Sequence, residues 1–237
     1  NFKVIRGDEK GVLGRFVLAA NEIKNENIVR ITGDCPLFDA GLLDKAVEIF
    51  LDKKIEYLCN FDPPTYPDGL DLEIFTKESL IEADKCCEDI KIREHVTPWI
   101  RKCGKFKKHN IKNNLDLSNM RWTVDEPEDF ILIKNIIKEF GGSIHFTWND
   151  VLKLNNQKPN LFLVNNMFKR NEGMELSQGQ KLWKKAKRII PGGNMLLSKR
   201  PEMFLPDKWP AYFSEAKGYF VKDLDNNQFV DMSIMGI

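Results

Sequence analysis

The 237-residue sequence has no apolar run long enough to cross a bilayer, and it has no signal peptide. It also lacks a charge excess of either sign: 36 Lys and Arg stand against 35 Asp and Glu, giving a net charge of +1. Composition therefore gives no argument for a nucleic-acid or a membrane partner. With 42% hydrophobic and 30% charged residues, the chain is expected to be a soluble, cytoplasmic protein that can bury a core.

Cysteine is scarce and is not arranged for metal binding. None of the five cysteines forms a C-x-x-C pair, which argues against a zinc site, and their odd number predicts reduced thiols in an intracellular setting. Cys35 has no adjacent base in the sequence, so we interpret it as a packing residue rather than a nucleophile.

The first part of the chain alternates between strand and helix patterns. Strands are predicted at 2–5, 27–31 and 57–61, and amphipathic helices at 11–24 and after Asp39. Because a β-α-β-α-β order requires crossover connections, it predicts an α/β fold with a mostly parallel, Rossmann-like sheet and helices on both faces.

The pattern then changes after a loop rich in Pro and Gly at 62–69. Further strands are predicted at 70–75, 105–113 and 120–124. Helices are predicted at 77–87, 93–102, 127–140 and 148–154, with Pro98 either kinking the second or marking its first turn.

We divide the chain into a domain at 1–154, an Asn-rich linker at 155–175 and a second part at 176–237. The second part is predicted to begin with an amphipathic helix at 176–190. Short strands follow at 203–205, 212–214, 219–223 and 229–232, with a hairpin turn at 225–227.

Two acidic motifs point to chemistry. Asp34 lies in Ile31-Thr-Gly-Asp-Cys-Pro-Leu37, and Asp125 lies in Arg121-Trp-Thr-Val-Asp-Glu-Pro-Glu-Asp129. Each aspartate follows a predicted strand, at the sheet edge where α/β proteins bind ligands. Either residue alone is better explained as a turn aspartate or a helix N-cap. Together they favour a shared Mg²⁺ site, because magnesium takes one or two protein carboxylates and fills its remaining positions with water and phosphate oxygens.

Residues 2–140 resemble the cytidylyltransferases of the spore-coat polysaccharide type, relatives of the enzymes that make CMP-activated sugars. Besides the two acidic motifs, the matching strings are Arg6-Gly-Asp-Glu9, Val12-Leu-Gly-Arg15, Tyr66-Pro-Asp-Gly-Leu-Asp-Leu-Glu73 and Arg93-Glu-His-Val-Thr-Pro98. The resemblance implies a nucleotide-diphospho-sugar-transferase-like sheet. It also implies that Asp34 and Asp125 hold Mg²⁺ while a sugar hydroxyl attacks the α-phosphorus of CTP and pyrophosphate leaves.

The resemblance further implies an acceptor side to the site. It would be lined by Asp71, Glu73, Arg93, Glu94 and His95, and Arg15 could neutralise a phosphate. Each residue also has a plainer interpretation, because strand carboxylates can share a solvated face and helix-surface charges are common.

The family's opening strand and its glycine- and arginine-containing phosphate loop have no counterpart before Asp34, and there is no G-x-x-x-x-G-K. We therefore expect this polypeptide alone to be inactive and to bind CTP poorly. Calorimetry that found micromolar Mg-CTP binding would contradict this expectation.

Residues 176–237 resemble the N-terminal arm of class III aminotransferases of the glutamate-1-semialdehyde aminomutase type. The matching strings are Ile189-Ile-Pro-Gly-Gly-Asn194, Gly218-Tyr-Phe-Val-Lys-Asp-Leu-Asp225 and Phe229-Val-Asp-Met232. Such enzymes use pyridoxal phosphate, but the resemblance covers only the arm and implies that this segment does not bind the cofactor.

The leading hypothesis is a cytidylyltransferase fused to part of an aminotransferase, with CTP and a sugar acceptor as partners and a homo-oligomer possible. A glycosyltransferase on a similar sheet is the first alternative, although Asp34 has no D-x-D partner and Asp71-Leu-Glu73 only imitates one. The second alternative is a non-catalytic docking piece.

Overall fold

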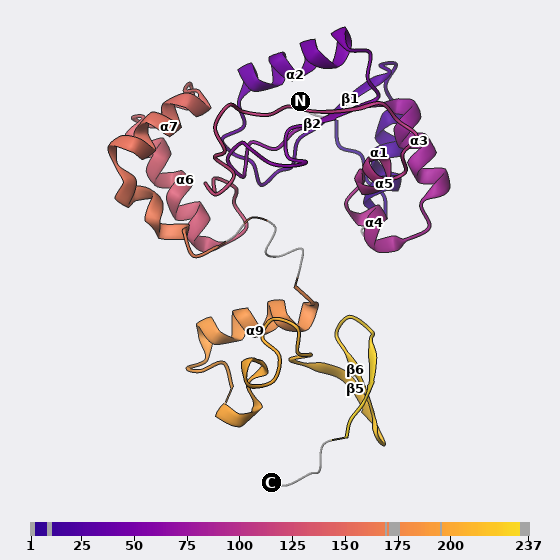
Figure 1. Ribbon diagram of the computed structural model, residues 1–237, viewed down its shortest axis with the longest axis vertical. Helices are drawn as coiled ribbons and strands as arrows, with labels where there is room; N and C mark the ends of the chain where they lie inside the picture. The colour runs from indigo at the N-terminus through magenta and orange to yellow at the C-terminus, as the bar shows by residue number, and fades with distance from the viewer. Residues whose placement is uncertain (1–2, 9–10, 169, 171–175, 195, 233–237) are drawn as a thin grey trace. The chain divides into compact units, whose positions relative to one another are not determined.

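The computed structural model describes residues 3–8, 11–168, 170, 176–194 and 196–232. The chain divides into two compact units, Asn1–Arg170 and Asn171–Ile237 (Figure 1). No helix in the described ranges has the length and apolar character needed to cross a membrane.

The first unit contains a four-stranded sheet. Its strands are β1 (Asn27–Arg30), β2 (Tyr57–Cys59), β3 (Glu73–Thr76) and β4 (Lys108–Asn110), in the spatial order β1-β3-β2-β4. β3 pairs antiparallel with both β1 and β2, whereas β2 and β4 are parallel. Three of the four strands therefore run in one direction, and β3 runs against them.

Helices cover both faces of this sheet, because successive residues of a strand point to opposite sides. Leu58 and Ile74 pack in one cluster with α2 (Ala40–Asp52). Tyr57 and Phe75 pack in the other with α1 (Val12–Asn21), α3 (Lys77–Cys86) and α5 (Pro98–Lys102). Figure 1 shows α2 above β1 and β2, with α1, α3, α5 and α4 (Ile90–Glu94) grouped together at the right of the view. The predicted α/β fold with helices on both faces of the sheet is confirmed. The prediction of a mostly parallel sheet did not include the antiparallel strand β3, which lies between β1 and β2.

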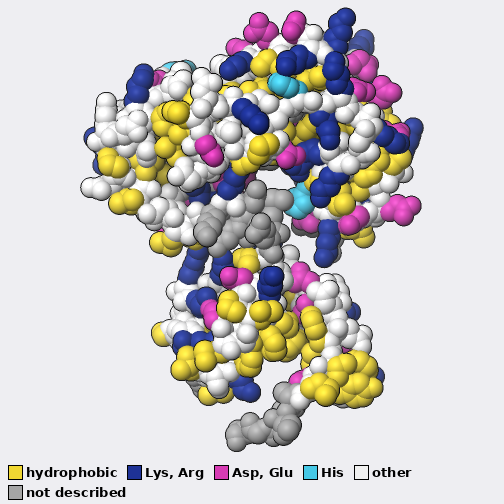
Figure 2. Space-filling model, viewed as in Figure 1, with side chains coloured by type: hydrophobic (Ala, Val, Ile, Leu, Met, Phe, Trp, Pro, Cys, Tyr) yellow, Lys and Arg dark blue, Asp and Glu magenta, His cyan; other side chains and the backbone are white. Residues whose placement is uncertain are grey.

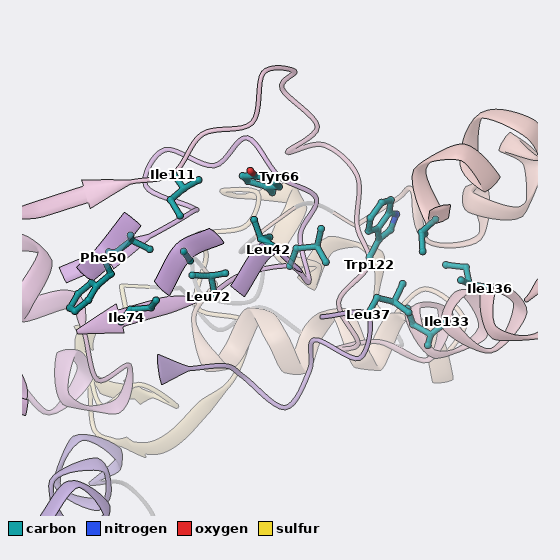
Figure 3. Packing of buried hydrophobic residues seen from close by; sticks show 14 of the residues in the cluster. Leu37, Leu42, Phe50, Tyr66, Leu72, Ile74, Ile111, Trp122, Ile133 and Ile136 are labelled. Atoms are coloured by element: carbon teal, nitrogen blue, oxygen red, sulfur yellow. The ribbon is translucent and has the colours of Figure 1, made fainter. Parts of the chain in front are cut away.

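The α2 cluster continues into a helical layer made by α6 (Pro127–Glu139) and α7 (Trp148–Gln157). Figure 3 shows Trp122 near Leu37 and near the α6 residues Ile133 and Ile136, with which it shares one cluster. Asp39 links two of these helices: its Oδ1 accepts a hydrogen bond from Leu42 N at 2.8 Å, and its Oδ2 accepts one from Trp148 N at 2.9 Å. One buried carboxylate thus satisfies amide donors at the start of α2 and of α7.

Several predicted strands are shorter than expected or are not formed. Residues 3–5 have no regular structure, and β1 is a half-exposed edge strand rather than a buried one. Residues 120–124 form a single bridge, Arg121 with Asp68, instead of a strand. Their backbone groups bond to loops on either side, which replaces a sheet ladder.

The predicted strand at 70–75 begins only at Glu73 because a side chain takes over the pairing before it. Asn60 donates from Nδ2 to Leu70 O at 2.8 Å and accepts from Leu72 N at 3.0 Å. The buried amide therefore satisfies the backbone that a neighbouring strand would otherwise pair.

The predicted helix at 93–102 is two helices, α4 and α5. Pro98 is the first residue of α5, the position where its missing N–H costs nothing. Val96 between them has φ +67°, which breaks the helical path.

Much of the predicted linker is folded. α7 extends to Gln157, and a 3₁₀ segment, η1 (Pro159–Asn165), follows it. Leu161, Phe162 and Val164 pack against the core that includes α6. These apolar side chains among the asparagines extend the first unit to Arg170; residues 171–175 lie outside the described ranges.

The second unit pairs α9 (Gln178–Ile189) with a three-stranded antiparallel sheet of β5 (Phe213–Lys217), β6 (Phe220–Asp223) and β7 (Gln228–Val230). The predicted turn joins β6 to β7, where the Asp223 carboxylate accepts from the backbone amides of Asp225 and Asn227. The predicted strand at 203–205 is wrong: a 3₁₀ turn, η3 (Pro201–Met203), lies there after η2 (Leu197–Lys199). Figure 2 shows hydrophobic side chains on the visible surface of this unit.

Candidate active site

The two acidic motifs meet through their backbones. Val124 N donates to Asp34 O at 2.8 Å, and Thr123 Oγ1 donates to the same carbonyl at 3.1 Å. Asp34 lies in a turn after β1, and Asp125 comes directly before the helix α6. The two predicted metal-holding residues therefore lie on adjoining segments of the first unit.

A third motif, the Pro- and Gly-containing loop, packs against the second. Asp68 N donates to Met120 O at 2.9 Å, and Trp122 N donates to Asp68 O at 2.7 Å. Gly69 has φ +99°, and a Cβ there would lie 2.5 Å from the carbonyl carbon of Trp122. Only glycine allows both this backbone conformation and this close approach.

Arg121 organises the acidic side chains that these loops present. Its Nε and Nη2 donate to the two oxygens of Asp129 at 3.0 and 2.8 Å. Nη2 also reaches Asp125 Oδ2 at 2.9 Å, and Nη1 reaches Asp68 Oδ2 at 3.4 Å. The guanidinium group is largely buried, and its planar fork suits such a bidentate contact.

Asp129 is the anchor of this arrangement. Its fully buried carboxylate also accepts from Asn165 Nδ2 at 2.8 Å and from the amides of Asp125 and Glu126. Burial alone would raise the pKa of Asp129, but the hydrogen bonds from Arg121, Asn165 and the backbone together lower it. The N-cap of α6 is Glu126 rather than Asp125, so the capping interpretation of Asp125 is wrong.

The Asp125 carboxylate is about half exposed (53%), and Arg121 holds one of its oxygens. Desolvation raises the pKa of Asp125, and the negative charges of Asp34 and Asp129 add to the rise against the opposing Arg121. Asp34 and Asp125 are thus close enough to repel each other, which a bound cation would relieve.

The donor set fits magnesium. It consists of two hard carboxylates next to further acidic side chains, and carboxylates outnumber guanidinium groups around it. Within the described ranges no cluster of three or more His, Cys, Asp or Glu side chains could hold a metal. Two protein ligands leave the remaining positions of an octahedral ion to water and phosphate oxygens, as magnesium prefers.

Asp68 and Asp71 form the acidic side of the loop. Burial raises the pKa of Asp68 to about 6, with Asp71 and Asp125 adding to the rise while Arg170 and Arg121 oppose it. Burial also raises the pKa of Asp71, again against Arg170. Arg170 Nη2 contacts both oxygens of Asp71, with 2.5 Å to Oδ2.

The remaining predicted acceptor residues lie in different surroundings. Glu73 is buried in the sheet, where Arg30, Tyr57 and Thr97 donate to its oxygens. Arg93 donates to the carbonyls of Asp84 and Cys87 at the end of α3 and to the Asp84 carboxylate.

Glu94 and His95, which follow Arg93, are exposed. Arg15 is half-buried on α1, and its side chain lies against Gly7. Asp34, Asp71 and Asp125 therefore share one acidic region. Glu73 and Arg93 lie outside it: Glu73 makes its contacts within the sheet, and Arg93 makes its contacts at the end of α3.

Cys35 is buried beside Thr32 Oγ1, at 3.2 Å. Burial raises the pKa of its thiol to about 12, so the group remains a thiol at neutral pH. This agrees with the interpretation of Cys35 as a packing residue.

Sequence reasoning missed the residues that hold the site together: Arg121, Asp129, Asn165 and Arg170. The spacing of Arg121, four residues before Asp125 and eight before Asp129, could have indicated a shared cluster. Asn165 and Arg170 contact partners far away in the sequence and lie in the predicted linker, so no local pattern marks them.

Comparisons with known proteins indicate the family of the chain. The family model for cytidylyltransferases matches residues 1–130. A solved cytidylyltransferase from Leptospira borgpetersenii has a similar fold, with a TM-score of 0.63 and 35% identity, over 66% of this chain and 67% of that one.

Two curated relatives are similar to part of the chain. An uncharacterised protein of Methanocaldococcus jannaschii, MJ1063, is 37% identical over 140 residues, which are 58% of this chain and 56% of that protein. The spore coat polysaccharide biosynthesis protein SpsF of Bacillus subtilis is 29% identical over 163 residues, 67% of this chain and 66% of SpsF. The chain thus spans less than two thirds of either relative.

A third relative is an aminotransferase, and its similarity covers a shorter stretch of the chain. A 3-aminobutyryl-CoA aminotransferase of Cloacimonas acidaminovorans is 35% identical over 60 residues, covering 25% of this chain and 14% of that enzyme. The family assignment rests on the longer match: with more than half of its residues fitting the family model and a solved family member sharing its fold, the chain belongs to the cytidylyltransferase family.

Proposed function

We propose that the first unit transfers CMP from CTP to a sugar hydroxyl and releases pyrophosphate, with Mg²⁺ held by Asp34 and Asp125. The observation that carries the proposal is the hydrogen bond from Val124 N to Asp34 O, because it brings both acidic motifs to one place. The family membership and the polysaccharide-biosynthesis relative SpsF support a sugar as the acceptor.

In this proposal each carboxylate has a separate task. Asp34 and Asp125 would bind the cation, and bound Mg²⁺ would neutralise charge that develops on the phosphoryl oxygens. Arg121 keeps Asp125 in place through one oxygen and leaves the other free for the cation. Asp71 would accept a hydrogen bond from the acceptor sugar.

Pyrophosphate release tests this function. The 237-residue chain and a version extended into the adjoining coding sequence would be incubated with CTP, Mg²⁺ and a panel of sugars. We expect no release from the 237-residue chain alone. From the extended version we expect release that needs both Mg²⁺ and a sugar, together with a CMP-sugar of matching mass. Hydrolysis or transfer of a preformed sugar nucleotide, without pyrophosphate, would instead support the glycosyltransferase alternative.

We further propose that the second unit corresponds to the arm of a class III aminotransferase. The short match to the Cloacimonas enzyme supports this, together with the amphipathic helix and three-stranded sheet. Pyridoxal phosphate added to the 237-residue chain should give no Schiff-base absorbance. A stable Schiff base on this chain would contradict the assignment to the arm alone.

A further inference from the structure

Arg170 is the last residue of the first unit, and its side chain turns onto the acidic region rather than into solvent. Only 11% of the side chain is exposed. Nη2 contacts both oxygens of Asp71, and Nη1 donates to Tyr66 O at 3.3 Å. The same Nη1 lies 3.9 Å from Asp68 Oδ1. One guanidinium group therefore holds the loop from Tyr66 to Asp71 at three points.

Arg170 also completes a line of alternating charges. Asp71 contacts Arg170, Arg170 approaches Asp68, and Asp68 contacts Arg121. Arg121 in turn contacts Asp125. The proposed acceptor side and the proposed metal side are thus joined by two arginines that share the carboxylate of Asp68.

The two carboxylates predicted for the acceptor side differ in what they can still bind. Glu73 is 1% exposed, and three donors occupy its oxygens. Asp71 keeps 28% of its side chain exposed, and among the described residues Arg170 is the side chain that donates to it. An ionised carboxylate has about four lone-pair sites, so Asp71 retains capacity for a ligand's hydroxyl groups.

We infer that Arg170 is a positioning residue for the acceptor: it fixes the Asp71 carboxylate so that its free lone pairs meet the hydroxyl groups of the sugar. This rests on the proposed function. Because burial of an unpaired carboxylate is costly, loss of Arg170 would let Asp71 turn away or take up a proton. Either change weakens binding of a polyol without touching the reacting phosphate.

The test compares Arg170→Gln and Arg170→Lys with Lys158→Gln, all made in the extended version of the chain. Lys158 also pairs with a carboxylate, that of Glu139, but on the surface near α7. We expect Arg170→Gln to raise the KM for the sugar about tenfold, with smaller changes in kcat and in the KM for CTP. Lysine keeps the charge and should restore part of the affinity, and Lys158→Gln should match wild type. Equal changes in the KM for both substrates, or no rescue by lysine, would overturn the inference.

A second measurement does not depend on activity. Arg170→Gln, Asp71→Asn and the double variant form a cycle whose unfolding in urea reports whether the two side chains are coupled. We expect the double variant to be less destabilised than the sum of the single ones, because each single change leaves its partner buried and unpaired. Additive effects would overturn the inference whatever the assay shows. If the wild-type extended version released no pyrophosphate although the cycle showed coupling, the contact between Arg170 and Asp71 would be supported. The acceptor role would then be rejected together with the proposed function.

Discussion

Val124 and Asp34 are joined by a backbone hydrogen bond of 2.8 Å that connects the two acidic motifs of the chain. The bond uses the amide of the residue just before Asp125 and the carbonyl of Asp34 itself. This contact involves backbone atoms only, so it leaves the carboxylates of Asp34 and Asp125 available for a cation. The backbone therefore fixes the spacing of the proposed metal ligands independently of their charges.

Replacing either proposed ligand should strongly reduce the activity of the extended version without unfolding the protein. We expect Asp34→Asn and Asp125→Asn each to lower kcat/KM for CTP by about a hundredfold or more, since an amide cannot replace an anionic ligand near developing phosphate charge. Pyrophosphate release measured across a Mg²⁺ titration checks this, and higher Mg²⁺ should restore part of the activity.

The exposed Asp44 on α2 provides the control, because Asp44→Asn removes a surface carboxylate outside both motifs. It should behave as wild type. Activity within about twofold of wild type in both ligand variants would contradict the metal assignment.

Gly69→Ala should destabilise the first unit by about 3 kcal/mol. The φ of +99° is unfavourable for alanine, and the new Cβ would meet the Trp122 backbone at 2.5 Å. Equilibrium unfolding in urea measures the loss. Gly14→Ala is the matched control: it lies in α1 with no atom within 4 Å, so it should be neutral or stabilise by about 0.5–1 kcal/mol. A Gly69→Ala protein as stable as wild type would show that the loop adapts.

The sequence indicated the helices of the first unit and the motifs that meet at the site, because both depend on local patterns. The 3.6-residue period located α1, α2 and α6. The position of β3 between β1 and β2 could not be predicted from such local patterns. It depends on pairing between segments more than forty residues apart, such as Arg30 with Glu73.

Long-range side-chain contacts were also hidden from the sequence. Asn60 replaces a strand partner for Leu70 and Leu72, and Arg170 reaches the loop near Asp71. The asparagine-rich composition of residues 155–175 predicts a linker. The apolar residues within η1 nevertheless bury enough surface to fold this part of the segment.

Asp68 should titrate near pH 6 in the folded protein. Its folded pKa is raised above the unfolded value, so its contribution to stability is present below about pH 4 and is lost as the pH rises through about 6. Carboxyl NMR measures the midpoint directly. Asp68→Asn should flatten the stability curve between those values by about 2–3 kcal/mol.

Asp150 offers a comparison of opposite sign. Hydrogen bonds from Thr147 lower the pKa of Asp150 to about 2, so its contribution is present near neutral pH and is lost as the pH falls through about 2. Asp150→Asn should therefore reduce stability at neutral pH. A titration midpoint for Asp68 near 4 would instead show that the arginine contacts fully offset the effect of burial on its pKa.

Arg93→Gln distinguishes a role in the fold from a role in substrate binding. The guanidinium group donates to the Asp84 and Cys87 carbonyls at 2.8 and 2.9 Å and pairs with the Asp84 side chain, so it satisfies the free carbonyls at the end of α3. Gln cannot reach all three acceptors, and we expect a loss of about 1–2 kcal/mol in urea unfolding with the KM for the sugar unchanged. Glu94→Gln, at the exposed neighbouring position, should leave stability as in wild type. A raised KM in Arg93→Gln at full stability would instead place Arg93 on the acceptor side, because the helix end would then not depend on it.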